Sequence, residues 1–433
     1  MLSKEDNELL CRVGPGTPMG EVMRQYWLPG ALSTELPAPD CDPLRLRLLG
    51  ENLIAFRVTS GKVGVVQNSC PHRGASLFFG RNEEDGLRCV YHGWKFDVTG
   101  ACVDMPNEPA ESNFKSKVKA VAYKATERNG VIWIYMGPRQ DNPPSLPDLE
   151  ANMLPEGQYS IGIFQRECNW MQALEGDIDT GHTVFLHTGA MKAENAPVDS
   201  WGYYALKDRA PHFEAVDTNV GTMYTAARAI DAQRRYHRIA QFLFPCYAMI
   251  PTGVLGLEVR VRAWVPIDDG HTFGLGINRV NARRFRDPTE MLPNTSDWLG
   301  RFRCAPNASN DYQIDRAKQR RMDSYTGLPS ITMEDQAVTE SMGEIYDRSK
   351  EHLGTTDAMI IRTRRRLIDA ARAMRDTGTL PPGVDEPSAY ATRTGGVMLP
   401  PDKSWVEGSA ELRKGFVDHP ELSRDVLGGV PAV

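Results

Sequence analysis

The sequence lacks any run of about 18 consecutive apolar residues, the length that a helix needs to cross a membrane. Its first ten residues, MLSKEDNELL, are charged and have no apolar core, so we expect no secretory signal peptide. An excess of basic residues is also missing, because 50 Lys and Arg residues stand against 56 Asp and Glu residues. Nucleic-acid binding normally needs a basic face. We therefore expect a cytoplasmic protein that binds neither a membrane nor nucleic acid.

Cysteine and histidine are both sparse. Eight cysteines are scattered along the chain without a C-x-x-C pair, so we expect reduced thiols and no disulfide framework. Most of them are expected to be small buried hydrophobic residues. Cys70 and Cys89 differ, because a histidine follows each of them after two or three residues. Four of the nine histidines fall in two tight groups, which indicates metal binding.

The order of the predicted elements indicates two domains. Alternating apolar residues predict strands over about 45–140, with a hairpin turn at Asn129-Gly130. The first 45 residues predict a short helix capped by Ser3 and then loops rich in proline and glycine. The segment GPRQDNPPSLPDLE (137–150) is rich in proline and predicts a linker. We therefore expect one domain over 1–150 and a second over 151–433.

The second domain is predicted to mix helices and strands. A helix is expected over 169–185 with Asn169 as its N-cap, and residues 333–375 are expected to be mostly helical, with an interruption at Leu353-Gly354. Strands are predicted between them, at 223–227, 236–243, 257–265 and 272–277. The order helix, strands, helix predicts an α+β domain rather than alternating βαβ units.

The first group of possible metal ligands is Cys70-Pro71-His72 with Cys89-Val90-Tyr91-His92. Two thiolates and two imidazoles on paired loops can hold a [2Fe–2S] cluster, with both cysteines on one iron and both histidines on the other. Structural zinc sites also use two cysteines and two histidines, but they usually begin with two cysteines close together. The pairing of one Cys with one His in each loop favours the iron–sulfur cluster.

The second group is Asp179-x-x-His182 followed after four residues by His187. Two imidazoles and one carboxylate form the facial triad of non-heme Fe(II) oxygenases. Asp179 and His182 are three residues apart and are expected on one face of a helix. His187 would lie roughly 140° around that helix from His182, at about 100° per residue. We therefore expect the helix to end, or to widen into a larger turn, between the two histidines.

These motifs resemble the Rieske non-heme iron oxygenases that hydroxylate aromatic rings. CPHRGASL and CVYHGWKF are similar to the Rieske box, and D-x-x-H-x₄-H resembles the iron motif of the same family. The segments GPGTPMGEVMRQYWLP, LRLLGENLIAFR and EHLGTTD are similar to the phthalate dioxygenase group, and the resemblance covers nearly the whole chain. It implies an α+β protein with an N-terminal all-β Rieske [2Fe–2S] domain and a helix-grip (START-like) catalytic domain with an antiparallel sheet.

The resemblance also implies the roles of the site residues. The expected cluster ligands are Cys70, His72, Cys89 and His92, and the expected ligands of a mononuclear Fe(II) are His182, His187 and Asp335. Asp335 is preferred because the family supplies an aspartate at the start of a late helix. Glu334 and Asp357 remain alternatives, although Asp357 has the position of a first-turn helix residue.

The resemblance gives Asp179 a role other than ligation. It implies that Asp179 links the iron site to a cluster histidine, His72 or His92, of a neighbouring subunit. It further implies a trimer or a hexamer of one subunit type and a separate reductase that carries flavin and an iron–sulfur cluster. The chain has no flavin or nicotinamide motif of its own, which agrees with a separate electron donor.

The expected function is that of a terminal oxygenase component. The resemblance implies hydroxylation of an aromatic carboxylate, such as phthalate or a chlorobenzoate, with O₂, and the expected reaction is cis-dihydroxylation. O-demethylation of a methoxylated aromatic acid is the alternative. A carboxylate in a pocket needs arginine, and the candidates are Arg209, Arg228 and Arg238. A Rieske ferredoxin that only carries electrons would need about the first 150 residues and would leave the second motif unexplained.

Overall fold

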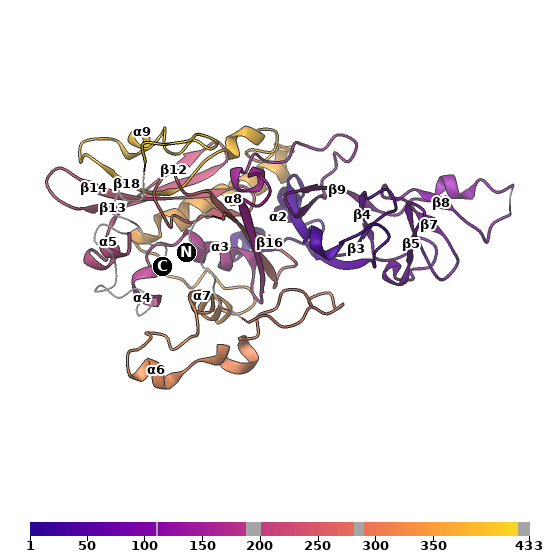
Figure 1. The fold of residues 1–433 in the computed structure, drawn as a ribbon, viewed down its shortest axis with the longest axis horizontal. Coiled ribbons are helices and arrows are strands. Elements are labelled where there is room, and N and C mark those ends of the chain that lie inside the picture. The colour runs from indigo at the N-terminus through magenta and orange to yellow at the C-terminus, as the bar shows by residue number, and fades with distance from the viewer. Residues whose placement is uncertain (110, 188–200, 281–289, 423–433) are drawn as a thin grey trace.

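The computed structural model describes residues 1–109, 111–187, 201–280 and 290–422. It has an elongated all-β part, which contains the first sheets of the chain, and a larger part in which helices pack on a third sheet (Figure 1). All pairs of named strands are antiparallel. The predicted α+β fold is therefore confirmed.

The N-terminal part contains two sheets. The 6-stranded sheet has the order β1-β10-β9-β4-β3-β2 and the 4-stranded sheet has the order β5-β6-β7-β8. The strands are β1 (Trp27–Leu32), β2 (Leu44–Leu48), β3 (Glu51–Arg57), β4 (Val63–Gln67), β5 (Arg81–Glu83), β6 (Gly86–Arg88), β7 (Lys95–Phe96), β8 (Cys102–Asp104), β9 (Ala122–Arg128) and β10 (Val131–Tyr135).

The hairpin between β9 and β10 forms where the sequence predicts it. Asn129 and Gly130 have φ values of 48° and 75°, and both lie in the left-handed region that this two-residue turn requires. All five residues of β10 are buried, as expected for β-branched and aromatic side chains in a central strand. The turn therefore fixes the register of the strand that forms the middle of this core.

The prediction of loops after the first helix was wrong. Helix α1 (Lys4–Cys11) begins at Ser3 as expected, but α2 (Pro18–Arg24) and β1 follow it. Pro29 and Gly30 interrupt the strand pattern of β1, and the pairing with β10 shifts register between Pro29 and Ala31. Such a bulge allows a strand to include residues that otherwise weaken it.

The third sheet is 8-stranded, with the order β11-β17-β16-β15-β14-β13-β12 and with β18 paired to β14. Its strands are β11 (Tyr159–Arg166), β12 (His212–Thr218), β13 (Gly221–Ala229), β14 (Arg235–Leu243), β15 (Tyr247–Met249), β16 (Arg260–Pro266), β17 (Thr272–Arg279) and β18 (Gly395–Leu399). The four predicted strands correspond to β13, β14, β16 and β17, and β16 begins later than predicted.

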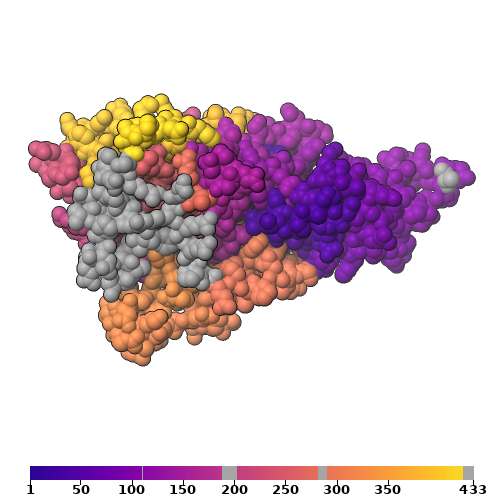
Figure 2. Space-filling view, in the orientation of Figure 1, coloured from indigo at the N-terminus to yellow at the C-terminus, as the bar shows by residue number. Residues whose placement is uncertain are grey.

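The remaining helices are α3 (Trp170–Ile178), α4 (Thr183–Leu186), α5 (Trp201–Lys207), α6 (Arg316–Arg320), α7 (Ile331–Glu340), α8 (Ala358–Thr377) and α9 (Trp405–Gly408). Helix α3 packs on β15 and β16, α8 packs on β12 and β13, and the two helices contact each other. The helices within 333–375 are interrupted at Leu353-Gly354 as predicted, but the interruption already begins at residue 341, so the prediction of helix was wrong for 341–352. Segments around α6 form a separate lobe in Figure 2.

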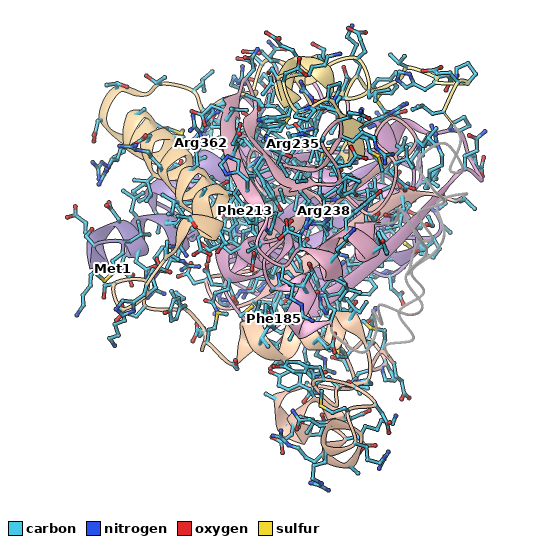
Figure 3. All side chains as sticks on the ribbon, turned by 90° about the vertical axis from the view of Figure 1, so that its left-hand side faces the viewer. Met1, Phe185, Phe213, Arg235, Arg238 and Arg362 are labelled. Carbon is cyan, nitrogen blue, oxygen red and sulfur yellow. The ribbon has the colours of Figure 1, made fainter. Side chains whose placement is uncertain are left out.

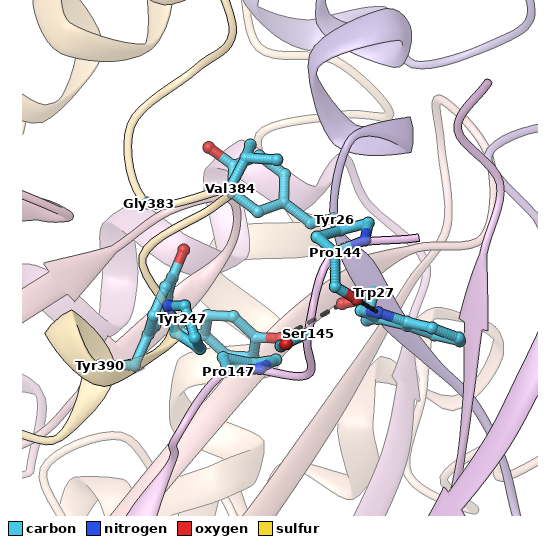
Figure 4. A pocket seen from close by; sticks show the side chains of 10 residues that line it. Tyr26, Trp27, Pro144, Ser145, Pro147, Tyr247, Gly383, Val384 and Tyr390 are labelled. Carbon is cyan, nitrogen blue, oxygen red and sulfur yellow. Dashed lines mark hydrogen bonds between the residues drawn. The ribbon is translucent and has the colours of Figure 1, made fainter. Parts of the chain in front are cut away.

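The two parts of the chain are joined by specific contacts. Arg301 pairs with Glu35 at 2.7 Å, and the backbone N–H of Leu49 donates to the carbonyl of Pro266 at 3.1 Å. Trp27 of β1 donates its indole N–H to the carbonyl of Pro144, which lies in the predicted linker, at 2.6 Å. Both residues lie beside Tyr390 of the C-terminal region (Figure 4). The linker is thus held between β1 and the segment 383–390. Among the described residues, no helix is long and apolar enough to cross a membrane.

Candidate metal centres and substrate cavity

The two loops that carry the predicted cluster ligands have the same backbone design. In one loop the N–H of Cys70 donates to Ala75 and the N–H of Gly74 donates back to Cys70, at 2.8 and 2.9 Å. In the other loop Cys89 and Gly93 make the matching bonds, at 2.8 Å to Trp94 and 2.9 Å to Cys89. Gly74 and Gly93 have φ values of 78° and 80°, which favour glycine. Each loop therefore turns a cysteine and the following histidine toward the same place.

The four side chains fit a [2Fe–2S] cluster. The rings of His72 and His92 have centroids 4.3 Å apart, and both cysteines are buried. Burial raises the pKa of the Cys70 thiol to about 11, and the nearby Cys89 adds to this effect, so bound iron would be needed to keep Cys70 as a thiolate. The Nδ1 atom of His72 is buried and has no hydrogen-bond partner among the described residues. A metal would satisfy it.

The second motif lies at a break between two helices. Helix α3 ends at Ile178, and Asp179 has an extended backbone with φ −89° and ψ 114°. His182 and His187 flank the short helix α4. The chain therefore leaves the helix before His182, and the expectation that Asp179 and His182 share a helix face was wrong. The two side chains still meet, because His182 Nδ1 lies 3.3 Å from Asp179 Oδ2.

The structure brings His182, His187 and Asp335 together. Asp335 Oδ1 lies 3.6 Å from Nε2 of His182 and 3.4 Å from Nε2 of His187. The possible ligand atoms of the three residues all lie within 4.8 Å of one another. Burial raises the pKa of Asp335, but the hydrogen bond to His187 and the charges of His182, His187 and Arg166 together outweigh burial, so the pKa is lowered. A carboxylate and two imidazoles in this geometry fit a mononuclear iron with open positions.

The alternative carboxylates occupy other positions. Glu334 lies behind His187, with Oε2 2.7 Å from the Nδ1 atom rather than from Nε2. Asp357 accepts a hydrogen bond from the N–H of Gly354 at 2.7 Å, at the start of α8, as its position in the sequence indicated. Asp335 itself lies inside α7, whose N-cap is Ser330.

Two of the predicted substrate arginines lie beside the iron loop, the segment 179–182 between α3 and α4. Arg228 on β13 and Arg238 on β14 are both buried, and the strand register puts them on the same face of the sheet. Arg238 donates to the hydroxyl of Thr180, which stands between Asp179 and Gly181. Burial and the neighbouring Arg238 lower the pKa of Arg228 to about 10. Two buried cations so close together favour an anionic ligand.

Arg209 lies differently. It is exposed, and its guanidinium carbon is 5.4 Å from the ring centroid of Phe185 on α4. Figure 3 labels Phe185 and Arg238, which come from α4 and β14. Arg209 directly follows Asp208, whose backbone carbonyl accepts a hydrogen bond from Arg228 at 2.8 Å, but its own side chain is exposed whereas the other two arginines are buried.

Sequence reasoning missed two polar residues of this site. The hydroxyl groups of Thr180 and Tyr224 are hydrogen-bonded, and Tyr224 projects from β13 on the same face as Arg228. The position of Thr180 inside the D-x-x-H motif was a signal that could have found it. Tyr224 has no such signal, because its place depends on strand register.

Comparisons with known proteins agree with this geometry. A Rieske [2Fe-2S] domain family model matches residues 26–121, and the model of the LigXa C-terminal domain like family matches residues 134–393. The 3-chlorobenzoate-3,4-dioxygenase oxygenase subunit of Comamonas testosteroni is 45% identical, over 96% of this chain and 100% of its own. The phthalate 4,5-dioxygenase oxygenase subunit of Pseudomonas putida is 38% identical, over 87% of each chain.

Solved structures agree on the fold. The crystal structure of dicamba monooxygenase bound to dicamba superposes with a TM-score of 0.56 at 17% identity, over 82% of this chain and 98% of that chain. Family models that match most of the chain, and relatives aligned along nearly all of it, support one conclusion. The chain belongs to the Rieske non-heme iron oxygenases, in the phthalate dioxygenase group.

Proposed function

We propose that the protein is the terminal oxygenase component that cis-dihydroxylates an aromatic carboxylate with O₂ and electrons from a separate reductase. One observation carries the proposal: a single chain combines two loops suited to a cluster with a group formed by His182, His187 and Asp335. Two buried arginines lie beside this group. When bound, the cluster supplies electrons and the mononuclear iron supplies open positions for oxygen chemistry. Cys70, His72, Cys89 and His92 would hold the cluster, and His182, His187 and Asp335 would hold the iron.

The arginines supply the binding of the substrate. Arg228 and Arg238, on one face of the sheet, would hold its carboxylate and so turn the ring toward the loop that carries Thr180. Arg209 would contribute at most from the exposed side of the site. The names of two relatives, which act on 3-chlorobenzoate and on phthalate, support an aromatic acid as substrate.

O-demethylation is the second candidate reaction. A relative that is 40% identical over 85% of this chain is named 5,5'-dehydrodivanillate O-demethylase oxygenase subunit. Both reactions use the same iron site, so the product decides between them.

The proposed partners are a reductase with flavin and an iron–sulfur cluster, and further copies of this chain in a trimer or hexamer. In Figure 1, strands β5, β7 and β8 beside the cluster loops lie at the opposite end of the molecule from α4 and α7. Electrons would therefore reach the iron from a neighbouring subunit, with Asp179 as the bridge to His72 or His92. Carbazole 1,9a-dioxygenase, solved as a complex of oxygenase and ferredoxin, supports delivery by a separate protein.

Two further points belong to the same proposal. We divide the chain into a Rieske domain over 1–150 and a catalytic domain over 151–433, because the proline-rich segment 137–150 separates the sheets of the two parts. We also propose a cytoplasmic location, which agrees with eight cysteines that are all free.

Product analysis under ¹⁸O₂ tests the proposed reaction. The purified protein, supplied with a flavin and iron–sulfur reductase and NADH, is incubated with phthalate, 3-chlorobenzoate and methoxylated aromatic acids. We expect a cis-dihydrodiol that contains two atoms of ¹⁸O from an acid without a methoxy group. Formaldehyde from a methoxylated acid, without any diol, would contradict dihydroxylation and establish the second candidate. No product from any aromatic acid would contradict both.

A further inference from the structure

Helix α7 presents two adjacent carboxylates to the iron site in different ways. Asp335 approaches the Nε2 atoms of both His182 and His187. Glu334 approaches the opposite nitrogen of His187, at 2.7 Å from Nδ1. Because an ionised carboxylate can only accept a hydrogen bond, this contact requires a proton on Nδ1. The Nε2 atom of His187 is then left as a lone-pair donor on the side of Asp335.

The Glu334 carboxylate is held in this position from both ends. Its side chain is 5% exposed, and its second oxygen accepts a hydrogen bond from the Thr326 hydroxyl at 2.6 Å. Thr326 is itself fixed, because its hydroxyl oxygen accepts from the N–H of Leu328 at 3.1 Å. To reach the metal, Glu334 would have to break both hydrogen bonds. Its geometry therefore differs from that of a spare ligand.

The other imidazole has a weaker and more open carboxylate partner. His182 Nδ1 lies 3.3 Å from Asp179, whose side chain is 26% exposed. The contact of Glu334 with His187 is shorter and sealed from solvent. The two histidines therefore have different carboxylate partners, and the partly exposed Asp179 is available for a second contact in an assembly.

We propose that Glu334 is a positioning residue that fixes the tautomer and orientation of His187 and thereby determines how tightly the mononuclear iron is held. This inference rests on the proposed role of His187 as a ligand. It assigns Glu334 to metal retention and leaves the passage of electrons to Asp179. Partners that hydrogen-bond to a metal-ligating histidine typically change metal affinity about 10- to 100-fold when they are lost.

Metal affinity, measured without catalysis, tests the proposal. The mononuclear metal is removed, and binding of Co²⁺ and Fe²⁺ is titrated against a chromophoric chelator for the wild type, Glu334→Leu and Glu334→Gln. We expect Glu334→Leu to weaken binding about 10- to 100-fold, as for other lost partners of a ligating histidine. Glu334→Gln keeps an acceptor oxygen for Nδ1–H and should recover part of that loss. The visible spectrum of the Rieske cluster should not change.

Glu340→Gln is the matched control. Glu340 is a buried glutamate on the same helix, and it accepts a hydrogen bond from Tyr312 at 2.7 Å, away from the histidines. We expect its metal affinity to equal that of the wild type. Equal losses in Glu334→Leu and Glu340→Gln would indicate a general packing effect and overturn the proposal. Glu334→Leu within twofold of the wild type, or Glu334→Gln no better than Glu334→Leu, would also overturn it.

Thr326→Val provides a second route if Glu334→Leu does not fold. It removes the hydroxyl that holds Glu334 and should weaken metal binding in the same direction but by less. Unchanged affinity in both Thr326→Val and Glu334→Gln would contradict the proposal. Because every readout is an affinity, failure to find an aromatic acid product would leave this test valid.

Discussion

At the candidate iron site, one oxygen atom, Asp335 Oδ1, faces the Nε2 atoms of both His182 and His187. Asp335 Oδ1 is within 3.6 Å of both Nε2 atoms, whereas Asp357 is used at the start of α8. Sequence spacing alone could not decide which of Asp335, Glu334 and Asp357 is the third iron ligand. The geometry separates the three, because one faces the shared metal position, one faces the back of His187 and one caps a helix turn.

This difference gives the first prediction. Asp335→Asn should lose the mononuclear metal and product formation, by more than the roughly 10- to 100-fold that follows loss of a residue that only supports a ligand. Asp357→Asn should keep both, because an altered helix start costs about 0.5–2 kcal/mol of stability. Iron content and product yield of the two variants decide. Retention of iron and activity in Asp335→Asn, with their loss in Asp357→Asn, would reverse the assignment.

The second prediction concerns the buried arginines. Arg228→Ala and Arg238→Ala should each raise the KM for the aromatic acid, since losing one partner of a buried charge pair costs about 2–5 kcal/mol. Arg209→Ala is the control, because an exposed charge contributes about 1 kcal/mol or less. Steady-state kinetics with the three variants measure the effect. An unchanged KM in both buried variants would place the carboxylate elsewhere.

At the scale of elements, local signals predicted the hairpins well. The hairpin turn at Asn129-Gly130 was found because turn residues act on their immediate neighbours. The end of α3 at Ile178 was not found, because it depends on the loop that brings His182 to a residue far along the chain. Strand β1 was missed because its pairing with β10 tolerates Pro29 and Gly30 through a bulge.

The resemblance to the oxygenase family, and not residue spacing, made Asp335 the expected third iron ligand. Nothing within the segment around Asp335 indicates that it meets His187, because the contact depends on how α7 packs beside α3. The partnership of Glu334 with His187 was missed for the same reason. Such long-range pairs follow from the packing of the helices on the sheet and not from local pattern.

The turn between β16 and β17 carries the third prediction. His271 Nδ1 lies 2.8 Å from Asp268, which also pairs with Arg47 of the N-terminal part at 3.3 Å. Burial lowers the pKa of His271, but the hydrogen bond to Asp268 and the negative charges of Asp268, Glu167 and Glu344 together outweigh burial, so the pKa is raised. A raised folded-state pKa stabilises the protein fully below the unfolded value of about 6.5 and loses that effect as pH rises through the folded value.

The stability difference between the wild type and His271→Gln should therefore be largest near pH 6 and should shrink at higher pH. Thermal unfolding midpoints of both proteins from pH 6 to 9 measure it. His419, which pairs with Glu421, offers a control. The change His419→Gln removes an ion pair that lies outside this turn and whose carboxylate partner is largely exposed. A difference for His271→Gln that stays constant or grows with pH would contradict the account.

Within one chain, the cluster loops lie far from the candidate iron ligands His182, His187 and Asp335 (Figure 1). This separation favours electron transfer between subunits. The fourth prediction is that Asp179→Asn accepts electrons at the cluster but passes them to the iron far more slowly. The change keeps the shape of the side chain and removes the charge that orients the imidazoles. Stopped-flow reduction followed by chemical quenching separates the two steps. Transfer at the wild-type rate, or full activity in a demonstrated monomer, would refute the bridge.

The central claim is that electrons stored at the Rieske cluster are used at the site of His182, His187 and Asp335 to oxygenate an aromatic acid. A single-turnover experiment tests it most directly: the protein is reduced, freed of reductant, mixed with O₂ and 3-chlorobenzoate or phthalate, and assayed for cluster oxidation and product. The account predicts that the wild type forms product as its cluster is oxidised, and that His187→Ala keeps the cluster spectrum but forms none. Product from His187→Ala, or none from wild-type protein loaded with both metal centres, would contradict it.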